Sequence, residues 1–368
     1  MIAMSKSEMS HRERMLAALE FQQTDRLPFW PKLDKAYLAR YGKQLGAKTV
    51  ADAHCIFDTD RPLQTPGGYE LIFTPGTRKE INQTQTQRTI SYHVGRYKLI
   101  EKHSWDAPSC SWISVLYPIA SVEDIRAMTE FYLNCDVVPS AEAIAACHNR
   151  KSDFPDAIWY WNIGQSPLMN FVEWMAGVEN AHYLLADYNK EAEALFEAYQ
   201  QYLLKITRFA AEYIDVDIFY FIENTSTTLI SPGQYEAYCV GHILQYGKIL
   251  NAAGKRLGLH MCGHLKALLP TLAKSPAAVF EAFTSAPVGN TSLKEGRDAL
   301  PNKCLIGGTN AVTWLKPANE IIKEIEENLA CMENHRGLIL SSGGVMPPSC
   351  EPETVMEVAR WIRNYPIR

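Results

Sequence analysis

The second half of the chain alternates short apolar runs with longer amphipathic stretches, and no other feature constrains the fold as strongly. Apolar runs rich in branched and aromatic side chains occupy residues 157–162, 217–223, 256–262, 304–308 and 337–341. The stretches between them repeat apolar residues at the spacing of an amphipathic helix. Strands that alternate with helices indicate a parallel sheet with crossover helices. With seven or eight such units an α/β chain closes into a (β/α)8 TIM barrel, which is the fold we predict.

Two segments stand apart from this alternation. Residues 8–21 have an amphipathic pattern that predicts an N-terminal helical segment ahead of the barrel. Residues 64–117 contain several Pro-Gly turns, and polar and apolar residues alternate between the turns. Alternation with a period of two predicts antiparallel β-hairpins. We therefore expect one barrel domain over residues 1–368, with 64–117 as a β-hairpin insertion lying over the barrel.

Composition narrows the class of protein. The net charge is −5 with acids and bases mixed along the chain, so there is no basic stripe of the kind that nucleic-acid-binding proteins need. The chain has no run of about 18 apolar residues, and residues 1–15 are polar and lack the apolar core of a signal peptide. Nine cysteines with no regular spacing are typical of a reducing compartment. These features predict a cytoplasmic protein that binds neither nucleic acid nor membrane.

In a barrel of this kind the active site lies at the carboxyl ends of the strands. The positions that this rule selects are Trp30, Asn162, Glu223, His260, Cys262, Glu281, Thr309, Asn310 and 341–344. Aromatic residues at 159–161 and 219–221 predict a flat apolar pocket near the mouth for an aromatic or tetrapyrrole ligand. We assign substrate binding to Trp30, Trp161, Asn162, Tyr220 and Asn310.

The strongest candidate for chemistry is a His-x-Cys pair at the end of one strand. Residues 258–263 read Gly-Leu-His-Met-Cys-Gly, an apolar strand that breaks at a glycine. Because alternate residues of a strand point the same way, His260 and Cys262 present an imidazole and a thiol side by side. These are two ligands of a zinc site. Taken alone, the pair also fits a buried histidine and a buried cysteine packed inside the barrel.

Two further residues are candidates to complete a metal site. Cys350 stands at the start of the last helix, where the helix dipole lowers a thiol pKa and favours the thiolate that binds metal. The alternative is that Cys350 only begins the helix. Glu223 ends an apolar strand, and its carboxylate is a ligand, a general acid or base, the partner of a cation, or a solvated surface group. We predict His260 and Glu223 as catalytic residues, and a zinc ion bound by His260 and Cys262 with Cys350 or Glu223.

Motifs of several other enzyme classes are missing. The chain has no Gly-x-Gly-x-x-Gly after a strand and no Gly-x-x-x-x-Gly-Lys-Ser, so nucleotide binding by these motifs has no support. Gly-x-Ser-x-Gly is also absent, which removes support for serine hydrolase chemistry.

Segments spread through most of the chain match a known pattern. They are 12–19 with 25–28, 118–125, 229–236, 260–263, 306–308 and the glycine–proline loop before 353–355. On these segments the chain resembles the uroporphyrinogen decarboxylase-like superfamily, and more narrowly its cobalamin-dependent methyltransferase branch. The family fold is a (β/α)8 barrel. The resemblance implies a methyltransferase in which zinc activates a thiol or acts as a Lewis acid on a methyl donor.

The same resemblance implies a partner. The chain lacks the Asp-x-His-x-x-Gly motif that supplies a cobalt ligand in corrinoid domains, so cobalamin is expected to come from a partner corrinoid protein. The other reactant is expected to be a small methylated compound or a thiol, and the aromatic barrel interior makes a methoxylated aromatic one candidate.

Two departures from the family pattern keep alternatives open. The decarboxylases carry an N-terminal Arg-Gln-Ala-Gly-Arg-Tyr loop for substrate carboxylates, whereas residues 30–35 here read Trp-Pro-Lys-Leu-Asp-Lys. Thiol-type methyltransferases place the late cysteine in the glycine-rich loop, where Gly343 or Gly344 stands here, and this chain has Cys350 instead. A metal-independent decarboxylase is the second hypothesis, and a non-catalytic corrinoid-binding barrel is the third.

Overall fold

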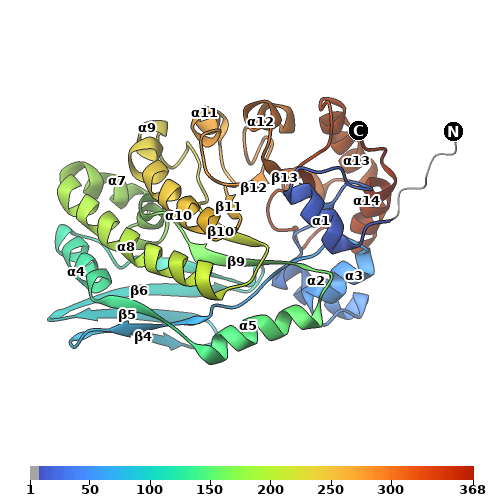
Figure 1. Ribbon diagram of the computed structural model, residues 1–368. Coiled ribbons are helices and arrows are strands. Elements are labelled where there is room, and N and C mark those ends of the chain that lie inside the picture. The colour runs from blue at the N-terminus through green and yellow to red at the C-terminus, as the bar shows by residue number, and fades with distance from the viewer. Residues whose placement is uncertain (1–7) are drawn as a thin grey trace, which may run out of the picture.

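Eight parallel strands form one curved sheet in the computed structural model, which describes residues 8–368 (Figure 1). The strands are β1 (Phe29–Trp30), β2 (Pro62–Gln64), β9 (Ile158–Gly164), β10 (Ile218–Ile222), β11 (Leu257–His260), β12 (Val279–Phe283), β13 (Cys304–Gly308) and β14 (Leu338–Ser341). Their order is β1-β14-β13-β12-β11-β10-β9-β2, so the short edge strands β1 and β2 nearly close the sheet. The predicted (β/α)8 barrel is confirmed. Residues 1–7, the first part of the polar stretch without a signal core, lie outside the described residues.

Helices follow the strands and surround the barrel. They are α1 (His11–Leu19), α2 (Lys35–Leu45), α3 (Val50–Phe57), α4 (Val122–Leu133), α5 (Ala141–Asp153), α6 (Pro167–Asn170), α7 (Val178–Asp187), α8 (Asn189–Tyr213), α9 (Pro232–Tyr235), α10 (Gly241–Ala252), α11 (Leu269–Leu272), α12 (Leu293–Ala299), α13 (Ala318–Ala330) and α14 (Pro352–Asn364). Two π-helical turns, η1 (Phe171–Met175) and η2 (Glu236–Val240), continue α6 and α9, and 3-10 turns cover Lys266–Leu268 and Thr313–Leu315. Within residues 8–368 none of the helices has the length and apolar character needed to cross a membrane.

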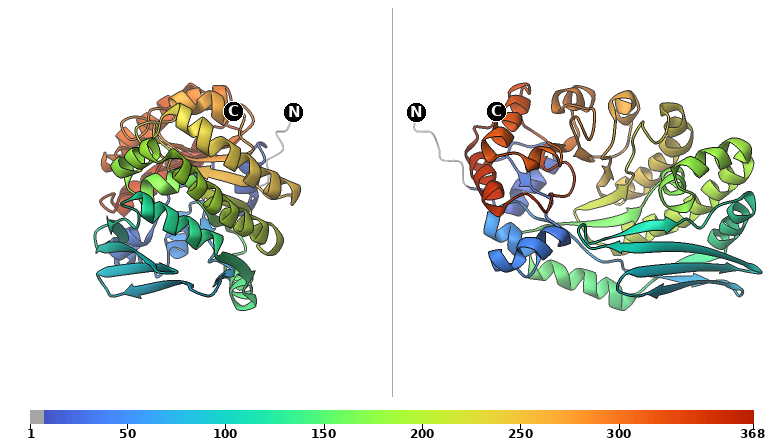
Figure 2. Two further views of the ribbon diagram at one scale, coloured as in Figure 1. Left: turned by 90° about the vertical axis from the view of Figure 1, so that its left-hand side faces the viewer. Right: turned by 180° about the vertical axis from the view of Figure 1, so that it is seen from behind.

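The region predicted as a hairpin insertion is antiparallel, as its alternating pattern indicated. Strands β4 (Thr77–Gln83), β5 (Gln87–Val94), β6 (Tyr97–Asp106) and β7 (Ser111–Leu116) form one sheet in that order. This sheet makes a separate layer on the side of the barrel that carries α4 (Figure 2). Tyr92 of β5 packs edge-on against Phe131 of α4, with ring centroids 5.1 Å apart. The pattern did not reveal that β3 (Tyr69–Phe73) pairs with the later strand β8 (Cys135–Pro139).

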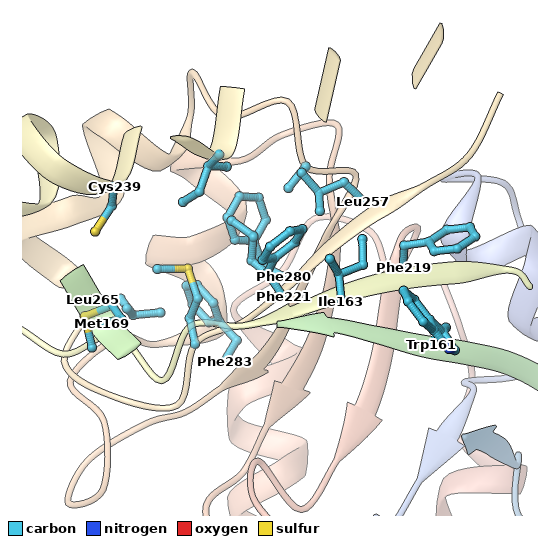
Figure 3. Packing of buried hydrophobic residues seen from close by; sticks show 14 of the residues in the cluster. Trp161, Ile163, Met169, Phe219, Phe221, Cys239, Leu257, Leu265, Phe280 and Phe283 are labelled. Atoms are coloured by element: carbon cyan, nitrogen blue, oxygen red, sulfur yellow. The ribbon is translucent and has the colours of Figure 1, made fainter. Parts of the chain in front are cut away.

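Apolar side chains fill both faces of the barrel strands, which is why these strands read as nearly continuous apolar runs. The larger cluster lies between strands and helices, and Figure 3 shows part of it around Trp161, Phe219, Phe221, Phe280 and Phe283. The smaller cluster fills the lumen with Trp30, Ile158, Ile218, Tyr220, Val279, Cys304, Ile306 and Ile339, and it includes Met15, Ala18 and Leu19 of α1. Helix α1 therefore closes one end of the lumen, and the site must lie at the other end.

Candidate active site

The open end of the lumen is polar where β11 and β12 end. His260 of β11 is the register neighbour of Ile222 on one side and of Glu281 on the other. Glu281 lies two residues beyond Val279, a member of the lumen cluster, so its side chain also faces inward. The apolar lumen thus ends in a layer that carries an imidazole and a carboxylate next to each other.

A chain of charged groups runs across this layer. Lys32 Nζ lies 2.6 Å from Glu281 Oε1, and the other oxygen, Oε2, makes a short hydrogen bond with His260 Nδ1. Burial favours the neutral forms of His260 and Glu281, but the attraction between these two groups outweighs burial. It raises the pKa of His260 to about 9, although the charge of Lys32 opposes this shift, and together with Lys32 it lowers the pKa of Glu281 to about 2. At neutral pH the site therefore holds a carboxylate and an imidazolium in contact.

Backbone strain is concentrated at these positions. Lys32 has φ 45° and Ala282, the residue after Glu281, has φ 63°, both in the left-handed region that favours glycine. The pairing of β12 with β13 shifts register between Glu281 and Phe283, which is a bulge of the kind that re-aims a side chain. Each such non-glycine residue costs of order 1 kcal/mol or more. The surrounding structure therefore maintains the Lys32–Glu281 geometry against local preference.

A second hydrogen-bond chain leads to Cys262. The Cys262 thiol donates to Asn224 Oδ1 at 3.7 Å, and Asn224 Nδ2 donates to both oxygens of Glu173 at 2.8 and 3.0 Å. Gln165 Nε2 donates to the same carboxylate at 2.6 Å. Burial raises the pKa of Glu173, although its two amide donors and nearby His260 oppose this shift. Asn224 is also left-handed, with φ 46°, and Glu173 belongs to the π-helical turn η1, a feature frequent at functional sites.

Gly263 allows the loop after Cys262 to approach its neighbour closely. A Cβ atom at this position would lie 2.2 Å from Ser226 Cβ and 2.6 Å from Thr225 O. The next residue, His264, donates its backbone N–H to Ser226 Oγ at 3.0 Å. Only glycine fits at this position of the His-x-Cys-Gly motif, because the loop after β10 lies against it. This close contact fixes the position of the neighbouring Cys262.

Glu223, predicted as a catalytic residue or metal ligand, borders this cluster, because its backbone oxygen accepts from Gln165 Nε2 at 3.2 Å, but its carboxylate is bonded elsewhere. Its carboxylate accepts a hydrogen bond from Ser166 N at 2.8 Å and one from Ser166 Oγ at 2.5 Å. The side chain is completely buried, and burial raises its pKa to about 7 even though both bonds from Ser166 favour the charged form. Glu223 thus ties β10 to the start of α6, where its hydrogen-bond partner is Ser166 rather than His260 or Cys262.

Cys350 behaves opposite to the sequence expectation. Although it stands just before α14, burial raises the pKa of its thiol to about 12. The sulfur is 3.9 Å from the carbonyl oxygen of Glu351, its hydrogen-bond acceptor. The cost of desolvating a thiolate outweighs the helix dipole here, so Cys350 is a buried neutral thiol.

The four donors predicted for zinc do not form one centre. Among the residues that the structure describes, no three His, Cys, Asp or Glu side chains are grouped closely enough to hold a metal ion. His260 and Cys262 remain an adjacent pair, with Glu281 on the histidine as metal-ligating histidines require. Catalytic zinc sites need three protein ligands, so the predicted set does not fit a zinc ion in this arrangement.

The predicted substrate-binding residues divide between the lumen and other places. Trp30 and Tyr220 belong to the lumen cluster, and Asn162 shares their face because it lies two residues beyond Tyr160. The Asn162 Oδ1 and Tyr220 hydroxyl oxygens are buried and have no hydrogen-bond partner among the described residues.

Trp161 and Asn310 do not have free side chains at the mouth. Trp161 belongs to the cluster of buried side chains in Figure 3, on the opposite face of β9. It packs on Phe209 and donates to Pro66 O at 3.0 Å, so its predicted place in the mouth is corrected. Asn310 uses its amide to join two loops, since Nδ2 donates to Ala286 O at 3.0 Å in the loop after β12 and Oδ1 accepts from Val312 N at 3.0 Å in its own loop.

Glu281 was selected as a strand-end position without a role, and four further residues of the cluster were not selected: Lys32, Gln165, Glu173 and Asn224. Lys32 was visible only as the residue standing where decarboxylases have arginines. Gln165 directly follows the end of β9 and Asn224 follows β10 by two residues, so the strand-end rule could have found both. Glu173 lies inside a helical segment, and nothing in its pattern marked it.

Comparison with known proteins agrees with the barrel. The family model described as uroporphyrinogen decarboxylase (URO-D) matches residues 118–365. A solved structure of a methyltransferase from Methanosarcina mazei has a TM-score of 0.60 and 16% identity, and covers 96% of this chain and 98% of its own. A D-psicose 3-epimerase structure with D-fructose covers 65% of this chain and 84% of its own at 13% identity and a TM-score of 0.36. No curated protein matches the chain.

The family match covers well over half of the chain, including β9 to β14 and the mouth residues His260, Cys262 and Glu281. The structural match extends over nearly the whole of both chains and shows that the fold is shared. This chain belongs to the uroporphyrinogen decarboxylase family.

Proposed function

We propose that this protein is a methyltransferase that moves a methyl group between a small methylated compound or thiol and a corrinoid carried by a partner protein. The observation that carries the proposal is the pairing of the His260 imidazole and the Cys262 thiol at the end of β11, inside the mouth of the barrel. The similarity in fold to a methyltransferase from Methanosarcina mazei over nearly all of both chains supports it.

The residues at the mouth suit the departure of a methyl group from oxygen or sulfur. The corrinoid, when bound, supplies the centre that accepts or gives the methyl group. When a methyl group leaves an ether, the carbon–oxygen bond breaks and the oxygen keeps the electron pair. His260, with its pKa raised to about 9, holds a proton at neutral pH that can neutralise this oxygen. Cys262 is held beside it by Asn224, which orients the thiol toward the same space.

The aromatic side chains packed beneath the polar layer of the mouth suit contact with an apolar methylated substrate. Trp30 and Tyr160 lie with ring centroids 6.1 Å apart, and Tyr160 and Tyr220 with centroids 5.5 Å apart. These rings belong to the packed side chains that fill the lumen, so a substrate would lie above them at the mouth. Among the described residues, Asn162 Oδ1 and the Tyr220 hydroxyl are buried atoms of this region without a hydrogen-bond partner. A methoxylated aromatic compound, with a flat ring and a few polar substituents, matches this combination.

Zinc remains a prediction of the sequence. Only His260 and Cys262 of the predicted donors are adjacent, so we propose that zinc, when bound, is held through these two side chains, with Nε2 of a neutral His260 on the metal in place of the proton described above. Cys350 and Glu223 are committed elsewhere, to the Glu351 carbonyl and to Ser166. No chemical step above depends on the metal.

Decarboxylation of a tetrapyrrole is the second chemistry of the family and has less support here. It requires cations at the mouth that are free to bind substrate carboxylates. Lys32 stands where the decarboxylases have their arginine loop, and its ammonium already pairs with Glu281 at 2.6 Å. His260 is engaged by the same carboxylate.

A transfer assay separates these functions. Purified protein is incubated with cob(I)alamin and a panel of methoxylated aromatics, methylamines and methylthiols, and methylcobalamin formation is followed by its absorbance. A parallel sample receives uroporphyrinogen without a corrinoid. We expect methyl transfer from at least one donor and no decarboxylation. Decarboxylation without transfer would establish the second function, and binding of cobalamin with neither reaction would indicate a non-catalytic barrel.

A further inference from the structure

The loop that carries Lys32 is fixed in place by the loop after β14. Ser342 Oγ donates to Pro31 O at 3.0 Å, and Met346 N donates to Lys32 O at 3.1 Å. These bonds hold the left-handed backbone of Lys32, so the residue has little freedom to move out of the mouth. A lysine in a strained, anchored position is not an ordinary surface cation.

The Lys32 ammonium is held from two sides within the mouth. It lies 5.3 Å from the centroid of the Trp30 ring and 2.6 Å from Glu281 Oε1. The side chain is only 14% exposed, and that of Glu281 is 3% exposed. A buried carboxylate with one oxygen on an ammonium keeps its orientation, because rotation would leave both charges without a partner.

Glu281 transmits this orientation to His260. Oε1 is occupied by Lys32, so Oε2 is the oxygen that meets His260 Nδ1. A carboxylate hydrogen-bonded to Nδ1 fixes the orientation of the ring and keeps a proton on Nδ1. The second ring nitrogen, Nε2, is then the one that can face a ligand. The bulge at Ala282 is what directs Glu281 toward both groups.

We propose that Lys32 is a positioning residue that fixes the orientation of His260 by holding Glu281. Among the contacts of the described residues, Lys32 makes no hydrogen bond with His260; its charge acts directly on the pKa of His260, which it lowers, whereas its effect on the ring orientation passes through the carboxylate. The consequence for catalysis rests on the proposed methyltransferase function, whereas the consequence for the His260 ring is independent of it. Asn224, which follows the neighbouring strand β10, accepts the hydrogen bond of the Cys262 thiol.

The test compares Lys32→Met and Lys32→Arg with the control Lys294→Met, because Lys294 is half exposed and pairs with Asp298 on the surface of α12. Side-chain 15N NMR spectra of the histidines are recorded at one pH, and the His260 signals are identified by their loss in His260→Gln. We expect the Nδ1 signal of His260 to move in Lys32→Met, to stay near its wild-type position in Lys32→Arg, and to be unchanged in the control. An unchanged Nδ1 signal in Lys32→Met would overturn the proposal.

Kinetics give a second readout with whichever methyl donor is active. We expect Lys32→Met to lower kcat roughly 10- to 100-fold with KM changed less than twofold, and Lys32→Arg to recover most of kcat. Loss confined to KM would overturn the positioning role and point to direct substrate binding. If Lys32→Met does not fold, Lys32→Gln takes its place in both measurements. If no donor is active in the wild type, the proposed function fails, and the NMR comparison still decides the role of Lys32.

Discussion

Asn224 accepts a hydrogen bond from the Cys262 thiol through Oδ1, at 3.7 Å, while its Nδ2 holds the carboxylate of Glu173. This side chain therefore joins two groups that come from different parts of the barrel, the end of β11 and the π-helical turn after β9. Its left-handed backbone, φ 46°, is what brings the amide between them. The hydrogen bond to Asn224 therefore fixes the position of the Cys262 thiol, a restraint that a core cysteine held by packing alone would lack.

The first prediction concerns the side chain of Asn224. Asn224→Ala leaves Cys262 without its acceptor and Glu173 with one amide donor in place of two. We expect kcat/KM for methyl transfer to fall roughly 10- to 100-fold, since a small displacement of a reacting group has that effect. The unfolding free energy should fall by only about 1 kcal/mol for the lost hydrogen bonds. Activity within twofold of the wild type would show that the thiol needs no orientation by Asn224.

Glu223 predicts a specific pH dependence of stability. Its pKa is raised in the folded protein to about 7 from 4.5, so the stabilisation it gives is complete below pH 4.5 and is lost as pH rises through 7. The loss is on the order of 3 kcal/mol once the group is ionised. Urea unfolding should show it in the wild type and not in Glu223→Gln, whose amide can still bond Ser166. If the unfolding free energies of the two proteins changed equally with pH, ionisation of Glu223 would not destabilise the folded protein.

Gly263 predicts a steric effect next to the reactive pair. In Gly263→Ala the new Cβ meets Ser226 Cβ at 2.2 Å, so the loop carrying Cys262 must move. We expect a loss of about 1–3 kcal/mol in unfolding free energy, as in other overpacked sites, together with a large loss of activity. The matched control is Gly241→Ala in α10, where a Cβ meets nothing within 4 Å and helix propensity gains about 0.5–1 kcal/mol. Similar behaviour of the two variants would argue against the close approach at Gly263.

Metal content tests which of the predicted donors take part in any zinc site. Catalytic zinc sites have three protein ligands, and only two adjacent donors, His260 and Cys262, stand here. We therefore expect weak zinc binding, and dialysis against a chelator should remove the metal. His260→Ala and Cys262→Ser should abolish it, whereas Cys350→Ser and Glu223→Gln should retain the wild-type stoichiometry. Tight zinc that disappears in Cys350→Ser would place the last loop of the barrel in a metal centre and contradict the arrangement described above.

The barrel was predictable because its strands are buried on both faces. Strands such as β10 and β14 consist almost entirely of apolar residues, and helices follow them in the chain. The edge strands β1 and β2 are only two and three residues long and have no periodic pattern, so they entered the prediction as extended segments at most. The pairing of β3 with β8 joins residues on either side of the insertion, and short-range patterns do not contain it.

Site residues could be predicted where their position follows from the alternation of side chains along a strand. They could not be predicted where it depends on burial or on the geometry of a helix. His260, Cys262 and Glu281 follow from alternation at the ends of β11 and β12. The same alternation, applied to β9, separates Asn162 on the lumen face from Trp161 on the outer face. Glu173 required knowledge of a π-helical turn, and Cys350 required knowledge of its burial, which decides its pKa against the helix dipole.

We propose that His260 and Cys262 form the reactive pair at the mouth, whereas Cys350 is structural. The most direct test is methyl transfer to cob(I)alamin with the wild type, Cys262→Ser and Cys350→Ser, using the best donor found for the wild type. We expect Cys262→Ser to lose at least about 100-fold in kcat/KM, of the order expected for a group that acts in the transition state. We expect Cys350→Ser to keep its activity within a few-fold of the wild type. Full activity of Cys262→Ser together with an inactive, folded Cys350→Ser would contradict this proposal.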